Sequence, residues 1–156
     1  MPRKSIPQKR QTIPDAVYNS SLVTQLINKV LRDGKKSLSQ KICYLAMRNV
    51  ANISNSEPLQ ILLTAIKNAT PLVEVRAKRV GGTILQLPIE IGERRGNSLA
   101  IKFLVDSART RPGKNIVIKL QNEIIDASNN IGNSVKKKED LHKKAESSKS
   151  LGNIKR

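Results

Sequence analysis

The chain contains very few aromatic and sulfur-containing side chains. Among its 156 residues are two tyrosines, one phenylalanine and no tryptophan. Modules that bind single-stranded nucleic acid by base stacking need several aromatic side chains, which excludes that class. The lone Cys43 excludes an internal disulfide and a paired-cysteine metal site, and its position beside an apolar helix face predicts a small buried side chain. A core of Leu, Ile, Val and Ala favours packed helices with a little sheet.

Acidic residues are also scarce. The chain has 29 Lys and Arg against 12 Asp and Glu, for a formal net charge of +17. Such an excess predicts a polyanionic partner. A membrane surface is the weaker choice, because the most basic segment lacks an apolar face and no stretch approaches the roughly 18 apolar residues that span a bilayer. The N-terminus also lacks the apolar region of a secretory signal. Nucleic acid is therefore the predicted partner, and no membrane partner is expected.

No arrangement of reactive side chains suggests an enzyme. His142 is the only histidine, and it lies in a polar stretch where a solvated or phosphate-contacting role is expected. Residues 34–37 (GKKS) resemble the end of a phosphate-binding loop, but Lys29 stands where that motif needs glycine, and a predicted helix precedes it. Glu123 and Asp126 are interpreted as ordinary solvated carboxylates. We predict no catalytic residue, metal, cofactor or small-molecule substrate.

Apolar periodicity predicts a mainly α fold of about six helices. In the first helix, Ser20 or Ser21 is the expected N-cap, and Gly34 follows the helix end. Ser56 is expected to cap the third helix, and Ser134 the last. The inward face of the second helix is predicted to contain six apolar residues: Leu38, Ile42, Leu45, Ala46, Val50 and Ile53.

Between the third and fourth helices the period changes to two. Residues 72–80 and 83–91 are predicted to form a projecting antiparallel β-ribbon that turns at Gly81-Gly82. The inward row at its base is expected to contain Val73 and Val75 with Leu87 and Ile89.

The predicted organisation is a single domain with irregular ends. Residues 1–19 contain several basic residues and three prolines, which predicts a flexible, extended basic arm. Residues 20–146 are the predicted helical RNA-binding domain, with the ribbon at 72–91. Residues 147–156 carry no periodic signal and are expected to form a flexible tail.

Basic residues cluster by predicted element, which favours contact with phosphate groups over simply solvated faces. Dispersed basic groups, a projecting ribbon and basic ends suit folded RNA read by shape, and no short DNA-recognition helix is apparent. The candidate RNA-binding residues are Arg3, Lys4, Lys9, Arg10, Lys35, Lys36, Arg76, Lys78, Arg79, Gly81, Gly82, Arg94, Arg95, Arg109, Arg111, Lys114, Lys136, Lys137 and Lys138.

Several strings along the chain resemble a known family. These are residues 33–37 (DGKKS), 73–83 (VEVRAKRVGGT), 86–90 (QLPIE) and 135–146 (VKKKEDLHKKAE). Together they resemble the ribosomal protein S-seven family of the small subunit, of bacterial or organellar type, across essentially the whole chain.

The resemblance implies about six helices with a projecting ribbon. It also implies a structural role in the small subunit as a primary binder of 16S-type rRNA at the 3′ major domain. Such a protein nucleates assembly of the head and lies near mRNA, exit-site tRNA, and neighbouring head and platform proteins. Residues 89–92 and 109–114 are more similar to plastid members, which implies the plastid stroma, with bacterial cytoplasm as the alternative. A free RNA-binding translational regulator is the alternative function.

Overall fold

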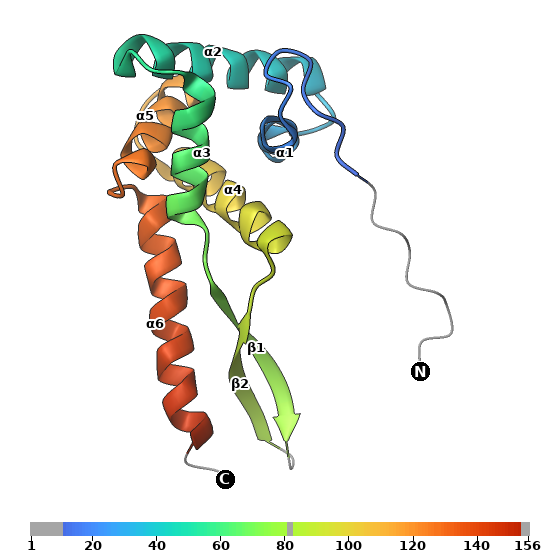
Figure 1. Ribbon diagram of the computed structural model, residues 1–156, viewed down its shortest axis with the longest axis vertical. Helices are drawn as coiled ribbons and strands as arrows, with labels where there is room; N and C mark the ends of the chain where they lie inside the picture. Colours follow the sequence, from blue (N-terminus) through green and yellow to red (C-terminus); the bar gives the residue numbers. More distant parts are fainter. Residues whose placement is uncertain (1–10, 81–82, 154–156) are drawn as a thin grey trace.

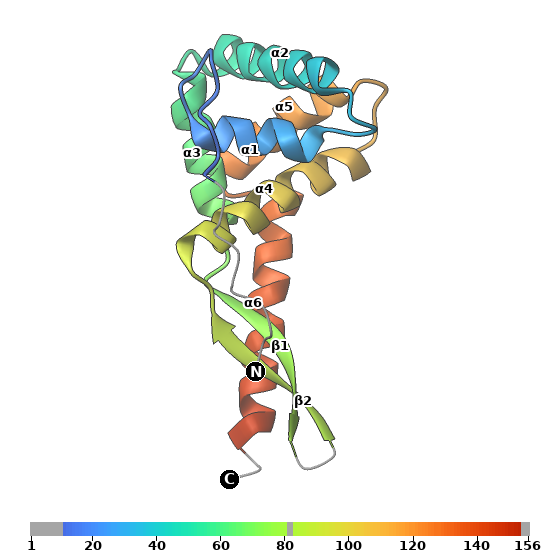
Figure 2. The same ribbon diagram turned by 90° about the vertical axis from the view of Figure 1, so that its right-hand side faces the viewer.

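The computed structural model describes residues 11–80 and 83–153. Within these ranges, six helices and a two-stranded antiparallel sheet confirm the predicted mainly α fold with a β-ribbon. Helices α1 to α5 form a bundle, and the ribbon and α6 extend from it side by side (Figures 1 and 2). The elements are α1 (Ser21–Val30), α2 (Lys36–Ser54), α3 (Pro58–Ala69), β1 (Val73–Val80), β2 (Thr83–Glu90), α4 (Glu93–Thr110), α5 (Ile116–Ser128) and α6 (Asn133–Asn153).

The core is aliphatic, as the shortage of aromatic residues predicts. Helices α1 and α5 bury the stripes expected from their periodicity, for example Val23 and Leu26 in α1 and Leu120 and Ile124 in α5. None of the described helices is long and apolar enough to cross a bilayer. The bundle is therefore held together mainly by close contact between Leu, Ile, Val and Ala side chains.

Helix α2 buries a different face from the predicted one. Of the six residues expected to point inward, Leu38, Leu45 and Ile53 are at least half exposed. The buried stripe is rotated toward Cys43 and Met47, which are fully buried. The prediction was wrong for the three exposed residues because α2 carries two adjacent apolar stripes, and only one faces the bundle. The expected burial of Cys43 is confirmed.

Local signals mark the starts of α3 and α5. Pro58 occupies the first turn of α3, where a missing N–H leaves no hydrogen bond unmade. Glu57, and not the expected Ser56, is the N-cap residue of α3. Asn115 caps α5 by accepting a hydrogen bond from the backbone N–H of Val117 at 3.0 Å. Ser134 lies inside the first turn of α6 and is not its N-cap, because α6 begins at Asn133.

The ribbon has the predicted length to within one residue at its base. Its register pairs Val75 with Pro88 and Arg76 with Leu87. Directly paired residues lie on the same face of a sheet, so Val75 and Leu87 are on opposite faces. The predicted inward row joining Val73 and Val75 with Leu87 and Ile89 is therefore wrong.

Helix α6 contacts the base of the ribbon. The Nε2 atom of His142 accepts a hydrogen bond from the backbone N–H of Leu72 at 3.1 Å. His142 thus joins α6 to the segment that enters β1, an internal contact that the sequence did not predict, and its side chain is still partly exposed. The helix continues through Asn153, whereas the sequence predicted an irregular tail from residue 147.

A buried carboxylate attaches the segment before α1 to the bundle. Asp15 is 7% exposed and accepts hydrogen bonds from the backbone N–H groups of Val17 and Tyr18. It also accepts the Tyr44 hydroxyl at 2.7 Å, and this hydrogen bond is the main reason that the pKa of Tyr44 is raised to about 12. The predicted arm is thus attached to α2 from Asp15 onward. Its first ten residues lie outside the described ranges.

Candidate nucleic-acid interface

The predicted RNA-binding residues fall on several separate parts of the fold. Arg3, Lys4, Lys9, Arg10, Gly81 and Gly82 lie outside the described residues. The other candidates form four groups: at the ribbon and the start of α4, around the α1–α2 loop, after α4, and at the start of α6. Each of these groups contains at least one cation that makes an internal contact, and only the structure shows which cations these are.

The first group surrounds Glu74 at the base of the ribbon. Glu74 is 7% exposed, and each of its carboxylate oxygens accepts from one arginine. Arg76 donates through Nε to Oε1 at 2.8 Å, and Arg95 donates to Oε2 through Nε at 2.8 Å and Nη2 at 2.7 Å. The hydrogen bond from Arg95 is the largest cause of the lowered pKa of Glu74. Farther along β1, Lys78 and Arg79 are exposed.

The second group surrounds a cavity of about 350 Å³ between the α1–α2 loop, α4 and α5. Apolar side chains line much of it, and Arg32, Lys35 and Arg109 also line it. Arg109 donates through Nη2 to the carbonyl oxygens of Lys29 and Val30, both at 3.3 Å, and so satisfies the end of α1. Lys36, the next candidate along the chain, is the first residue of α2 and is exposed. Arg32 was not among the residues predicted from the sequence, although its position in a basic loop signals a surface cation.

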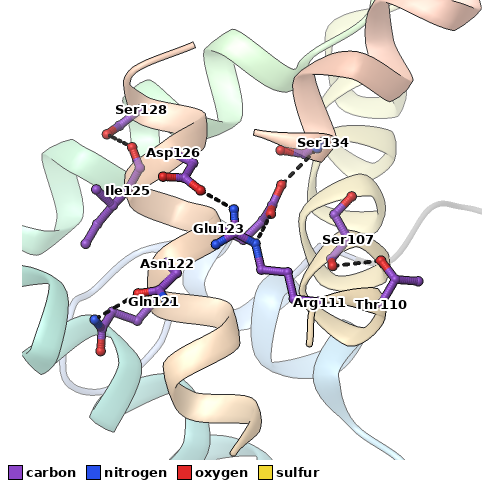
Figure 3. A network of polar contacts seen from close by, with 10 residues as sticks. All are labelled: Ser107, Thr110, Arg111, Gln121, Asn122, Glu123, Ile125, Asp126, Ser128 and Ser134. Carbon is purple, nitrogen blue, oxygen red and sulfur yellow. Dashed lines mark hydrogen bonds and ion pairs between the residues drawn. The ribbon is translucent and has the colours of Figure 1, made fainter. Parts of the chain in front are cut away.

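In the third group, Arg111 is engaged inside the protein (Figure 3). Its Nε donates to Oε2 of Glu123 at 2.8 Å, and its Nη2 is paired with Asp126. Glu123 is fully buried, and its Oε1 accepts from the backbone N–H of Ser134 at 2.8 Å. Burial alone would lower the pKa of Arg111, but its hydrogen bonds and ion pairs with Asp126 and Glu123 outweigh burial and raise that pKa.

This network corrects two interpretations from the sequence. Glu123 is a buried structural carboxylate that connects the α4–α5 loop to the N-terminus of α6, and it is not solvated. Arg111 is its counter-ion, and the Arg111 side chain is only 19% exposed, which leaves less of it accessible than of Arg76 or Arg95. In the same region Lys114 is exposed, and together with Lys119, which sequence analysis missed, it lines a cavity of about 530 Å³.

The fourth group also divides into engaged and accessible cations. Lys138 donates through Nζ to the carbonyl oxygen of Asn68 at 2.6 Å, and this holds α6 against the end of α3. The Asn68 amide in turn donates to the carbonyl oxygens of Ala127 and Ser128 at the end of α5. Lys136 is exposed and Lys137 is half-buried.

The accessible cations therefore lie on the ribbon, in interhelical loops and on α6, spread over different elements. Over the described ranges, no group of three or more His, Cys, Asp or Glu side chains is placed to hold a metal ion. Arginine and lysine at separate positions can bind phosphate groups of a folded polyanion, with arginine also able to bind in a bidentate manner.

Comparison with known proteins gives consistent results. The family model described as "Ribosomal protein S7p/S5e" matches residues 2–149. The small ribosomal subunit protein uS7c of Euglena gracilis is 52% identical over 155 residues, covering 99% of each chain. The uS7c protein of Ostreococcus tauri is 44% identical, again with 99% coverage of each chain. The uS7 protein of Thermoanaerobacter sp. (strain X514) is 51% identical, with 97% coverage of each.

Proposed function

Because this chain belongs to the ribosomal protein S7p/S5e family, we propose that it is a primary binder of the 3′ major domain of small-subunit, 16S-type rRNA. The family assignment makes the chain a structural protein of the small ribosomal subunit and not an enzyme. By binding the RNA early, it nucleates assembly of the subunit head.

The observation that carries this proposal is the distribution of accessible cations. The net charge is +17, and accessible basic side chains lie on the ribbon, the α1–α2 loop, the α4–α5 loop and α6. Several RNA helices that meet in a folded domain present phosphate groups in just such separate places. The proposed contacts from the described residues are Lys35, Lys36, Arg76, Lys78, Arg79, Arg94, Arg95, Arg109, Lys114, Lys136 and Lys137. Arg111 and Lys138 are left out because the Arg111 side chain is only 19% exposed and neutralises the buried Glu123, and because the half-buried Lys138 donates to the Asn68 carbonyl oxygen at 2.6 Å. Arg76, Arg95 and Arg109 also have partners inside the protein, but their guanidinium groups keep N–H donors outside those contacts.

We further propose that the part of the ribbon beyond Arg76 contributes least to the rRNA anchor and mainly serves a second site. Ribbon and α6 extend from the bundle in the same direction (Figure 1). They would then approach exit-site tRNA, mRNA, and neighbouring head and platform proteins. Replacing residues 78–83 by a short turn should preserve assembly into 30S particles and reduce tRNA retention. A natively folded variant that fails to assemble would contradict this division.

The proposed location is the plastid stroma, with bacterial cytoplasm as the alternative. The uS7c relatives of Euglena gracilis and Ostreococcus tauri favour the plastid, and the similarity to bacterial uS7 proteins of comparable identity supports the alternative. Cell fractionation followed by detection of the chain in plastid or cytoplasmic ribosomes distinguishes the two.

The rival function is a free RNA-binding regulator of translation. The direct test is sedimentation of a cell extract in a sucrose gradient, with the chain followed by antibody. A ribosomal protein is expected in the 30S and larger fractions at near-stoichiometric amounts. A chain found mainly at the top of the gradient, in cells with normal ribosomes, would favour the regulator.

A further inference from the structure

Glu74 is an acidic residue that two arginines contact at the base of the ribbon. The Glu74 side chain is 10% exposed, whereas the side chains of Arg76 and Arg95 are 58% and 56% exposed. One guanidinium belongs to β1 and the other to the first turn of α4. The carboxylate thus brings together two arginines separated by 19 positions along the chain, and both remain largely accessible to solvent.

We propose that Glu74 is a positioning residue that holds Arg76 and Arg95 as one preformed site for phosphate groups of the RNA backbone. This inference rests on the proposed binding to rRNA. It predicts that an acidic residue strengthens binding to a polyanion, which is the opposite of what its charge alone predicts.

The number of donors makes this possible. A guanidinium has five N–H groups, and Arg76 directs only its Nε toward Glu74. Arg95 directs Nε and Nη2 to a single oxygen of Glu74, which leaves its Nη1 group outside that contact. Each arginine can therefore bind Glu74 and a phosphate group at the same time.

Positioning lowers the entropy lost on binding. A free arginine side chain has many rotamers, and RNA binding would have to restrict them. Here the hydrogen bonds to Glu74 restrict Arg76 and Arg95 before RNA arrives. The Glu74 carboxylate faces the two guanidinium groups and is nearly buried, so its repulsion of RNA is weakened by the pairing.

The primary test is Glu74→Gln, compared with two matched controls. Glu90 and Glu93 are exposed acids close in sequence to the same region, and Glu90→Gln and Glu93→Gln remove the same charge. We expect Glu74→Gln to weaken binding about fivefold or more, from the reordering of two arginines. Each control is expected to leave affinity unchanged or slightly increased. Glu74→Gln binding as tightly as the controls would overturn the inference.

A second set of variants separates positioning from folding. In the Arg76→Ala/Arg95→Ala background, Glu74→Gln should have little further effect on affinity, because the residues through which it acts are gone. An undiminished loss in that background would show that Glu74 acts through the fold and overturn the inference. Arg76→Lys/Arg95→Lys keeps Glu74 and the net charge but lacks the guanidinium fork. It is expected to bind more weakly than wild type, and wild-type affinity would contradict the proposal even if Glu74→Gln fails to fold.

Two RNAs separate this inference from the proposed function. Affinities are measured on the 3′ major domain transcript and on an unrelated RNA duplex, with circular dichroism confirming native helix content. A protein with no preference for the transcript would contradict the proposed function. Even then, the ratio of wild-type affinity to Glu74→Gln affinity for the duplex tests the phosphate site. Equal affinities of the two proteins for both RNAs would refute the phosphate site.

Discussion

Arg111→Met should destabilise the fold strongly, although Arg111 belongs to a set of basic residues that the sequence associates with RNA. Methionine keeps an apolar stem and removes the guanidinium. Glu123 would then be a fully buried carboxylate whose remaining described partner is the backbone N–H of Ser134. Asp126 is 41% exposed, so water can solvate its carboxylate in the variant. The loss of its ion pair with Arg111 should therefore reduce stability less than the loss of the pair with Glu123.

The expected magnitude follows from the burial of Glu123. Removing one partner of a buried ion pair typically costs about 3–5 kcal/mol, and the surviving hydrogen bond to Glu123 places the cost of Arg111→Met at about 3 kcal/mol. For a urea dependence of about 2 kcal/mol per molar, the unfolding midpoint should fall by about 1.5 M. The assay is urea unfolding followed by circular dichroism at fixed ionic strength.

Two further variants make the result interpretable. Lys114→Met changes an exposed cation in the same loop and should alter stability by less than about 0.5 kcal/mol. The double variant Arg111→Met/Glu123→Met should recover part of the loss, because no buried charge remains. Where Arg111→Met is folded, the salt dependence of its RNA binding should match wild type. Equal unfolding midpoints for Arg111→Met and Lys114→Met would refute the structural role of Arg111.

Three other predictions concern stability. Gly132→Ala places a Cβ 2.8 Å from Oε1 of Glu123 and should destabilise by about 1–3 kcal/mol in thermal unfolding; an unchanged melting temperature would count against the close contact. Tyr44→Phe removes the hydrogen bond to Asp15 and should lose about 1 kcal/mol. Since folding raises the Tyr44 pKa from 10.0 to about 12, this contribution is present below pH 10 and disappears as the pH rises toward 12, so wild type and variant should converge there. Folding lowers the Glu74 pKa, so the stability that the ionised carboxylate contributes is present above pH 4.5 and is lost as the pH falls through the lowered pKa. The stability of Glu74→Gln should therefore depend less on acid pH than that of wild type. An identical pH dependence of stability in the two proteins would contradict the pairing.

The sequence predicts the elements well because their signals are local. The Gly81-Gly82 dipeptide and alternating apolar residues define the ribbon to within one residue at its base. The face that each strand presents was predicted less well. A two-residue turn pairs odd-numbered with even-numbered positions, so Val75 pairs with Pro88 and cannot share a face with Leu87. This register could have been worked out from the turn length.

Other features depend on tertiary contacts that periodicity does not contain. The burial of Cys43 and Met47 in preference to Leu38 and Leu45 reflects which stripe of α2 meets the bundle. The continuation of α6 beyond residue 147 also has no apolar signal in the sequence. Near that point, Ala145 and Ser148 are buried among the residues whose burial the structure describes.

The candidate interface is the part of the molecule that is hardest to predict from composition alone. The sequence identifies basic clusters but does not separate accessible cations from engaged ones. Arg111 and Lys138 resemble their neighbours in sequence, yet one neutralises Glu123 and the other holds the end of α3. Conversely, Glu74 has no signal of its own, because its partner Arg95 lies on another element.

The most direct test of the central claim is the salt dependence of binding to the 3′ major domain transcript. If the dispersed cations neutralise about six to ten phosphate groups, affinity should fall on the order of a thousandfold or more between about 50 and 200 mM salt, by analogy with duplex DNA. The logarithm of the affinity should decrease linearly with the logarithm of the salt concentration. An affinity that is nearly unchanged across this range would contradict binding through dispersed phosphate contacts.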